Sequence, residues 1–137
     1  MRQFLVDNLI AIIGLIGGAI SLFLSIRQYI HSKQLEIFST YVDKYSAIVT
    51  PEIYDKWYAA VRENKEEYWA ELTPVMIAYL NLVWEEAHLY DEKLISPKIW
   101  KIWEQEIRVI VMSSFAQHIE RRYRYHNMMN LLNKNKT

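Results

Sequence analysis

The sequence contains no cysteine, only three prolines and only three glycines in 137 residues. Without cysteine, the chain can form no disulfide, no thiolate nucleophile and no cysteine-ligated zinc site. The three glycines all lie between residues 14 and 18, so the rest of the chain lacks the residue on which many tight hairpin turns depend. This composition disfavours a β-rich domain and predicts an all-α protein.

Charge of neither sign is in excess, because 16 basic residues balance 16 acidic ones. The distribution along the chain is nevertheless uneven. Residues 52–97 carry ten acidic and four basic side chains, whereas residues 98–137 carry eight basic and three acidic ones. The basic end can therefore dock on the acidic middle of the chain or bind phosphate groups.

The most distinctive segment is the uncharged stretch 9–26, LIAIIGLIGGAISLFLSI. The 19 uncharged residues between Asp7 and Arg27 would extend about 28 Å as a helix, close to the thickness of the hydrocarbon core of a bilayer. No small-residue cleavage site follows, which argues against a cleaved signal peptide. We expect a retained transmembrane helix rather than a buried core helix, with residues 1–30 forming the span and a short outer tail.

The charges that flank this stretch predict its orientation. Arg2 and Asp7 lie on the short N-terminal side, whereas Arg27 and Lys33 follow the apolar residues. Because cytoplasmic flanks carry the excess of positive charge, the N-terminus should lie outside the membrane. Residues 31–137 should then form a cytoplasmic helical domain.

Small residues within the stretch recur at intervals of three and four positions, which places them on one face of a helix. Such a face lets the backbones of two spans approach closely, and serine hydroxyls can form hydrogen bonds between them. Small residues are also common in spans that do not associate, and that alternative stays open. The homo-oligomer interface that the pattern predicts consists of Ala11, Gly14, Gly18, Ser21 and Ser25.

Helical periodicity continues beyond the apolar stretch, and three hydroxyl–proline pairs follow: Thr50-Pro51, Thr73-Pro74 and Ser96-Pro97. A hydroxyl residue at the N-cap followed by proline at the first helical position is a common helix start. Tryptophan-rich apolar faces on the later helices should form the core, with an oligomer contact as the alternative. The last helix should break near Ser113-Ser114. The predicted helices span residues 4–49, 51–63, 66–72, 74–91 and 97–132.

No motif of an enzyme or a metal centre is complete in this chain. Glu85 and His88 form one E-x-x-H, but a di-iron helix bundle needs a second copy, which the sequence lacks. The four histidines are not spaced as metal ligands, and no nucleophile elbow or glycine-rich phosphate loop is present. We therefore expect a protein that is not an enzyme and that has neither a metal nor another cofactor.

One segment near the C-terminus suggests a ligand, because three arginines are interleaved with two tyrosines. Guanidinium groups bind phosphate oxygens in pairs, and tyrosine rings can stack on bases. Two other interpretations stay open: a solvated basic helix face that answers the acidic residues, and a surface that contacts anionic lipid headgroups. The residues that would bind a nucleotide, such as a small cyclic one, are Arg121, Arg122, Tyr123, Arg124 and Tyr125.

Further stretches carry a resemblance to known proteins. FSTYVDKY at residues 38–45 resembles the F-x-x-Y run of a loose family of small bacterial proteins with a single span. YLNLVWEE at residues 79–86, followed by LISP at residues 94–97, is similar to the apolar helix, acidic end and short loop of the same family. The resemblance covers residues 5–125 and implies one N-terminal span in the inner membrane of a bacterium, followed by a helical cytoplasmic domain.

Proteins of this build are found among the membrane effectors of bacterial anti-phage defence. The chain is similar in architecture to the small membrane effector of type III CRISPR systems, whose cytoplasmic domain binds cyclic tetra-adenylate as a tetramer. The resemblance implies a homo-oligomer that perturbs the membrane when it binds a cyclic oligoadenylate; DNA is not an expected partner. The alternative is a passive membrane anchor or adaptor that recruits a protein partner.

Overall fold

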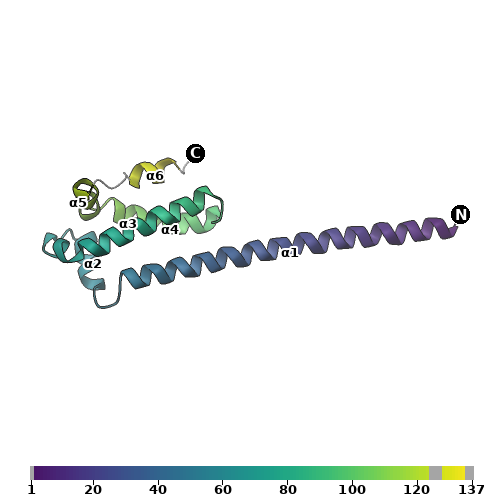
Figure 1. Cartoon of the computed structure of the whole chain (residues 1–137), viewed down its shortest axis with the longest axis horizontal. Coiled ribbons are helices and arrows are strands. Elements are labelled where there is room, and N and C mark those ends of the chain that lie inside the picture. The colour runs from purple at the N-terminus through teal and green to yellow at the C-terminus, as the bar shows by residue number, and fades with distance from the viewer. Residues whose placement is uncertain (1, 124–127, 135–137) are drawn as a thin grey trace. The chain divides into compact units, whose positions relative to one another are not determined.

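The computed structural model describes residues 2–123 and 128–134, and within them every regular element is a helix (Figure 1). Side chains are described from residue 15 to residue 123 and from 128 to 133. The prediction of an all-α protein is confirmed. The absence of glycine beyond residue 18 is the composition feature that pointed to this result.

The chain divides into two compact units at residue 36. The first unit lies within α1 (Arg2–Ile48), one helix of 47 residues. The sequence predicted a different boundary, at residue 30, where the chain would leave the membrane. The division into compact units does not test that prediction. Between residues 15 and 26, the large apolar side chains that are more than half exposed are Leu15, Ile16, Ile20, Leu22, Phe23, Leu24 and Ile26.

Large and small side chains of α1 occupy different arcs of the helix between residues 15 and 26. At 100° per residue, the exposed large side chains fall within an arc of about 200°. The remaining arc holds only small residues, namely Gly17, Gly18, Ser21 and Ser25. Beyond the adjacent residues and the backbone of its own helical turns, a methyl group added at Gly18 would meet no described atom within 4 Å, so this arc has room for a close neighbour.

In the part of the chain whose side chains are described, no helix has the length and apolarity needed to cross a membrane. The predicted span over residues 9–26 begins before that part and stays a prediction. Of the predicted interface residues, Ala11 and Gly14 lie outside the described side chains. Ser25 Oγ donates a hydrogen bond to the carbonyl oxygen of Ser21 at 2.9 Å, so its hydroxyl is satisfied within the helix.

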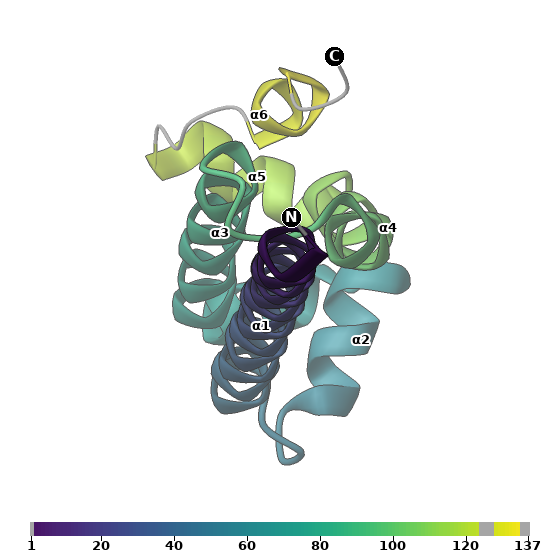
Figure 2. The ribbon, with the colours of Figure 1, turned by 90° about the vertical axis from the view of Figure 1, so that its right-hand side faces the viewer.

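The second unit, residues 37–137, is a bundle of short helices around one apolar core. Helix α3 packs against α4, α5 and α6 (Figure 2). Its most deeply buried side chains are spaced by three or four residues and form one face: Leu72, Met76, Leu80, Val83 and Ala87. The elements of this unit are α2 (Tyr54–Arg62), the 3-10 helix η1 (Glu66–Tyr68), α3 (Trp69–Asp91), α4 (Pro97–Val111), α5 (Ser114–Tyr123) and α6 (Met128–Lys134).

One of the three predicted helix starts is confirmed, at Ser96-Pro97. Ser96 Oγ accepts a hydrogen bond from the Ile99 N–H at 3.3 Å, and Pro97 is the first residue of α4. The predicted break near residue 113 is also confirmed. Ser113 Oγ accepts a hydrogen bond from the Ala116 N–H at 3.2 Å, just as α5 begins.

The predicted start at Thr50-Pro51 is wrong, because α2 begins only at Tyr54. The Ile53 N–H donates to the carbonyl oxygen of Thr50 at 3.1 Å, which closes a turn instead of a helix. A hydrogen bond from Thr50 lowers the pKa of the Glu52 carboxyl. The hydroxyl that was expected to cap a helix therefore serves this turn.

The predicted start at Thr73-Pro74 is wrong as well. Helix α3 begins at Trp69 and continues through Pro74, so the predicted short helix 66–72 is η1 joined to the first turn of α3. Pro74 has no N–H, so it cannot donate a hydrogen bond to the carbonyl oxygen of Ala70. Because Ala70 and Pro74 are both exposed, water can donate to that oxygen instead. Thr73 Oγ1 donates to the carbonyl oxygen of Trp69 at 2.7 Å instead of capping the helix.

Candidate functional site: a basic pocket beside helix α5

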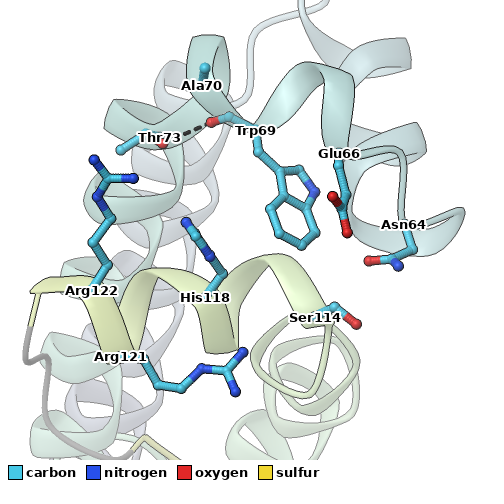
Figure 3. Close-up of a pocket in the computed structure, with 9 residues that line it drawn as sticks. All are labelled: Asn64, Glu66, Trp69, Ala70, Thr73, Ser114, His118, Arg121 and Arg122. Atoms are coloured by element: carbon cyan, nitrogen blue, oxygen red, sulfur yellow. Dashed lines mark hydrogen bonds between the residues drawn. The ribbon is translucent and has the colours of Figure 1, made fainter.

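A pocket of about 590 Å³ lies between the start of α3 and one face of α5 (Figure 3). Helix α5 contributes residues at positions i, i+4, i+7 and i+8, which share one face: Ser114, His118, Arg121 and Arg122. The opposite wall comes from the loop after α2, from η1 and from the first turns of α3: Asn64, Glu66, Trp69, Ala70 and Thr73.

The loop after α2 is shaped by a residue in the left-handed region. Asn64 has a φ of 57°, a conformation that asparagine tolerates better than most residues. The N–H groups of Glu63 and Lys65 both donate to the carbonyl oxygen of Ala59, at 3.2 and 3.1 Å. This closure ends α2 and directs the chain into η1, which places Glu66 at the rim of the pocket.

Trp69 forms the aromatic wall of the pocket. Its ring stacks on Phe115, with centroids 5.4 Å apart and planes inclined by 14°, and its centroid lies 5.2 Å from that of His118. The indole Nε1 is buried and has no hydrogen-bond partner among the described residues. Because an unpartnered buried N–H costs about 1–3 kcal/mol, an acceptor brought to this position would stabilise the pocket.

Arg121 and Arg122 give the pocket its positive charge. Both are exposed, and neither forms an ion pair with another described residue. By contrast, Arg62 pairs with Glu106 at 3.1 Å and Arg108 bonds Glu104 at 2.7 Å. Figure 3 shows the Arg122 side chain extending toward α3. Basic residues in the last turn of a helix also interact favourably with the negative end of the helix dipole. That interaction leaves their N–H groups available to bind a ligand.

The structure places two of the five predicted nucleotide-binding residues on this pocket, Arg121 and Arg122. Tyr123 is exposed at the end of α5 and does not line the pocket; its ring centroid lies 5.9 Å from the guanidinium carbon of Arg122. Arg124 and Tyr125 lie outside the described residues.

Most of the residues that line the pocket were not predicted from the sequence. The helical spacing of Ser114 and His118 with the two arginines could have identified the face that α5 contributes. Nothing in the sequence placed Trp69 or the loop at Asn64 opposite that face. Their position depends on α3 beginning before Pro74, which the hydroxyl–proline pattern did not predict.

Both residues of the E-x-x-H motif contact other side chains of the chain. Glu85 accepts hydrogen bonds from the Lys44 ammonium at 2.7 Å and from the Tyr41 hydroxyl at 3.1 Å. His88 stacks on Trp84, with ring centroids 5.8 Å apart. Among the residues that the structure describes, no group of three or more His, Cys, Asp and Glu residues could hold a metal ion.

The chemistry of the basic pocket suits an anion that carries phosphate groups. The guanidinium groups of Arg121 and Arg122, which form no ion pair with another described residue, can form paired hydrogen bonds with phosphate oxygens. A histidine, hydroxyls and an amide add further polar partners. The volume lies within the range of small-molecule sites. Guanidinium groups opposite an aromatic wall are typical of a binding site for phosphate-bearing ligands, so binding is the role that this geometry supports.

No family model, curated protein or solved structure matches the chain. The family resemblance stated from the sequence therefore stays a prediction.

Proposed function

We propose that this protein is a membrane-anchored, homo-oligomeric effector of bacterial anti-phage defence, whose helical unit receives a phosphate-bearing signal. The observation that carries the proposal is the apolar surface of α1, where seven large apolar side chains between Leu15 and Ile26 are more than half exposed. A patch of this kind marks a surface that lipid or protein covers. Each such side chain contributes about 1.5–3 kcal/mol when it passes from water to a fully apolar environment.

The two arcs of α1 fit a membrane oligomer better than a soluble coiled coil. The broad arc of large side chains would face lipid, and the narrow arc of small residues would let neighbouring spans approach closely. A soluble coiled coil would instead place large side chains in the seam between its helices. The proposed span includes residues 8–14, which continue the uncharged sequence toward the N-terminus.

The basic pocket supports the second half of the proposal. A small cyclic oligonucleotide carries several phosphate groups, and Arg121 and Arg122 present free donors on one face of α5. Such a ligand can drive a change only if it binds one arrangement of the oligomer better than another. A tenfold preference corresponds to about 1.4 kcal/mol of bias between the two arrangements.

Because the chain has no cysteine, a single introduced cysteine reports topology without background labelling. Gln3→Cys would mark the N-terminal side, and Gln105→Cys would mark the exposed face of α4. In spheroplasts treated with a membrane-impermeant maleimide, the first variant should be labelled at once and the second only after lysis. Both proteins should stay in the membrane pellet after alkaline carbonate extraction.

Each outcome bears on a different part of the proposal. Recovery of both variants in the carbonate supernatant would refute the membrane anchor. Labelling of Gln105→Cys, but not of Gln3→Cys, in intact spheroplasts would keep the anchor and reverse the predicted orientation.

A further inference from the structure

A second cavity, of about 380 Å³, opens on the helical unit and differs from the basic pocket in its lining. It is bounded by the C-terminal part of α1, by Tyr54 at the start of α2, and by α3 and α4. Its walls are aliphatic and aromatic, and its two carboxyl groups belong to Glu86 and Glu106. The lining residues include no lysine, arginine or histidine. The cavity is therefore mainly apolar, and of its two carboxyl groups Glu106 is paired with Arg62 at 3.1 Å, which leaves Glu86.

Glu86 is the unusual member of this lining. Its side chain is buried, and it forms no hydrogen bond or ion pair with another described residue. Loss of hydration raises the pKa of Glu86 to about 8, the neighbouring Glu85 adds to the rise, and the Lys44 ammonium opposes it. The ionised form of a buried carboxyl group is destabilised by its loss of hydration. A positive charge brought into the cavity would stabilise that ionised form.

Aromatic rings line the cavity beside this carboxyl group. The rings of Tyr45 and Tyr79 meet edge to face with centroids 6.0 Å apart, and those of Tyr41 and Trp103 lie 5.8 Å apart. The Lys44 ammonium sits 4.5 Å from the centroid of the Tyr41 ring, so this wall already receives one cation from within the chain. Rings combined with a carboxylate are the arrangement that holds organic ammonium groups in proteins.

We propose that this cavity binds a small organic cation, an alkylated or quaternary ammonium group on an apolar body, whose charge Glu86 neutralises. The aliphatic side chains of α4, among them Ile102 and Ile107, would cover the apolar body. The volume suits a ligand of this size. The inference is independent of the phosphate-bearing signal, because the two cavities share no lining residue.

Binding of a cation should be coupled to release of a proton. In the empty cavity Glu86 is protonated at pH 6.5, and the cation favours the carboxylate, so affinity should rise with pH until the carboxyl group is ionised. Burial raises the pKa of three nearby tyrosines above the ordinary value, so they do not titrate in this range: Tyr41, Tyr45 and Tyr79. The other charged or titratable groups around the site are Glu85, Lys44, Tyr54, Arg62 and Glu106.

The test is calorimetric titration of the full chain in mild detergent with benzyltrimethylammonium at pH 6.5 and 8.5. Choline is a smaller cationic probe, and 3,3-dimethylbutan-1-ol is its neutral isostere. The cations should bind about tenfold or more tightly at pH 8.5 than at pH 6.5, and the neutral alcohol should bind weakly at both. Repeating the pH 6.5 titration in buffers of different ionisation enthalpy should reveal about one proton released per cation.

Glu86→Gln removes the charge and keeps the shape of the side chain. This variant should bind benzyltrimethylammonium at least tenfold more weakly at pH 8.5 and with no dependence on pH. Glu71→Gln is the matched control on the same helix, because Glu71 is exposed, pairs with Lys56 and does not line the cavity. Failure of the native chain to bind either cation at pH 8.5 would overturn the proposal, as would equal binding of the neutral alcohol or undiminished binding by Glu86→Gln.

Discussion

The buried carboxyl group of Glu86 should make the stability of the protein depend on pH. Its pKa is about 8 in the folded protein and close to the ordinary value of 4.5 once the chain unfolds. The folded state therefore holds a proton that the unfolded state has already lost at neutral pH. By linkage, the free energy of unfolding should fall as the pH rises from about 4.5 to about 8 and should then level off.

The size of the effect follows from the difference between the two pKa values. Each unit is about 1.4 kcal/mol, so at pH 7 the free energy of unfolding should be about 3 kcal/mol lower than at low pH, because only the unfolded chain has released the Glu86 proton. Glu86→Gln cannot ionise and removes this pH dependence. Burial of the new amide adds a cost that does not vary with pH. The variant should therefore gain stability relative to the native chain by about 3 kcal/mol between pH 5.5 and pH 8.5.

The assay is urea unfolding of the full chain in mild detergent, followed by tryptophan fluorescence at pH 5.5, 7 and 8.5. Trp57, Trp100 and their partners in the core report loss of packing. Glu71→Gln controls for loss of one carboxylate from the same helix. A difference between Glu86→Gln and the native chain that stays constant across these pH values would refute the argument that burial keeps this group protonated.

Three further predictions test the helix starts and the small arc of α1. Ser96→Ala removes the N-cap of α4 and should lower the free energy of unfolding by about 1 kcal/mol in the same urea assay. Pro74→Ala supplies an N–H that can donate to the carbonyl of Ala70, and it should raise the free energy of unfolding by at most about 3 kcal/mol. In detergent, crosslinking should show a smaller oligomer for Gly18→Ile than for the native chain. Ala19→Ile is the control, because residue 19 lies about 100° around the helix, among the large side chains, and its oligomer should be unchanged. Equal loss of the oligomer in both variants would rule out the small arc as the interface.

The sequence predicted helices well where one local interaction decides the outcome. Ser96 and Pro97 start α4 because the hydroxyl caps an N–H three residues later and nothing competes with it. Thr50 fails as a cap because its hydroxyl serves a turn with Glu52. Thr73 fails because the apolar face of α3 extends back to Leu72, and packing of that face outweighs the local preference of a proline.

The candidate sites could be predicted only in part, for a similar reason. Arg121 and Arg122 were identifiable because both belong to one short run of the sequence. Trp69 joins them through tertiary packing against Phe115, which no local pattern encodes. The burial of Glu86 could not be predicted, because Glu85 and Glu86 are adjacent residues of the same type. Nothing in the sequence tells which of the two side chains is buried.

The binding half of the central claim is tested by charge reversal at the basic pocket. The double variant Arg121→Glu/Arg122→Glu should lose binding of cyclic oligonucleotides while remaining in the membrane. Lys98→Glu/Lys101→Glu changes the net charge by the same amount on exposed residues of α4 and should bind as the native chain does. Equal binding by both double variants would move the ligand site elsewhere.

The most direct test of the whole account is the mass of the full chain in detergent, with and without cyclic tetra-adenylate and related cyclic oligonucleotides. The account predicts one defined homo-oligomer whose stability or size changes with one of these ligands, and no such change in Arg121→Glu/Arg122→Glu. A monomer that responds to none of them would contradict the account and would favour a passive membrane anchor.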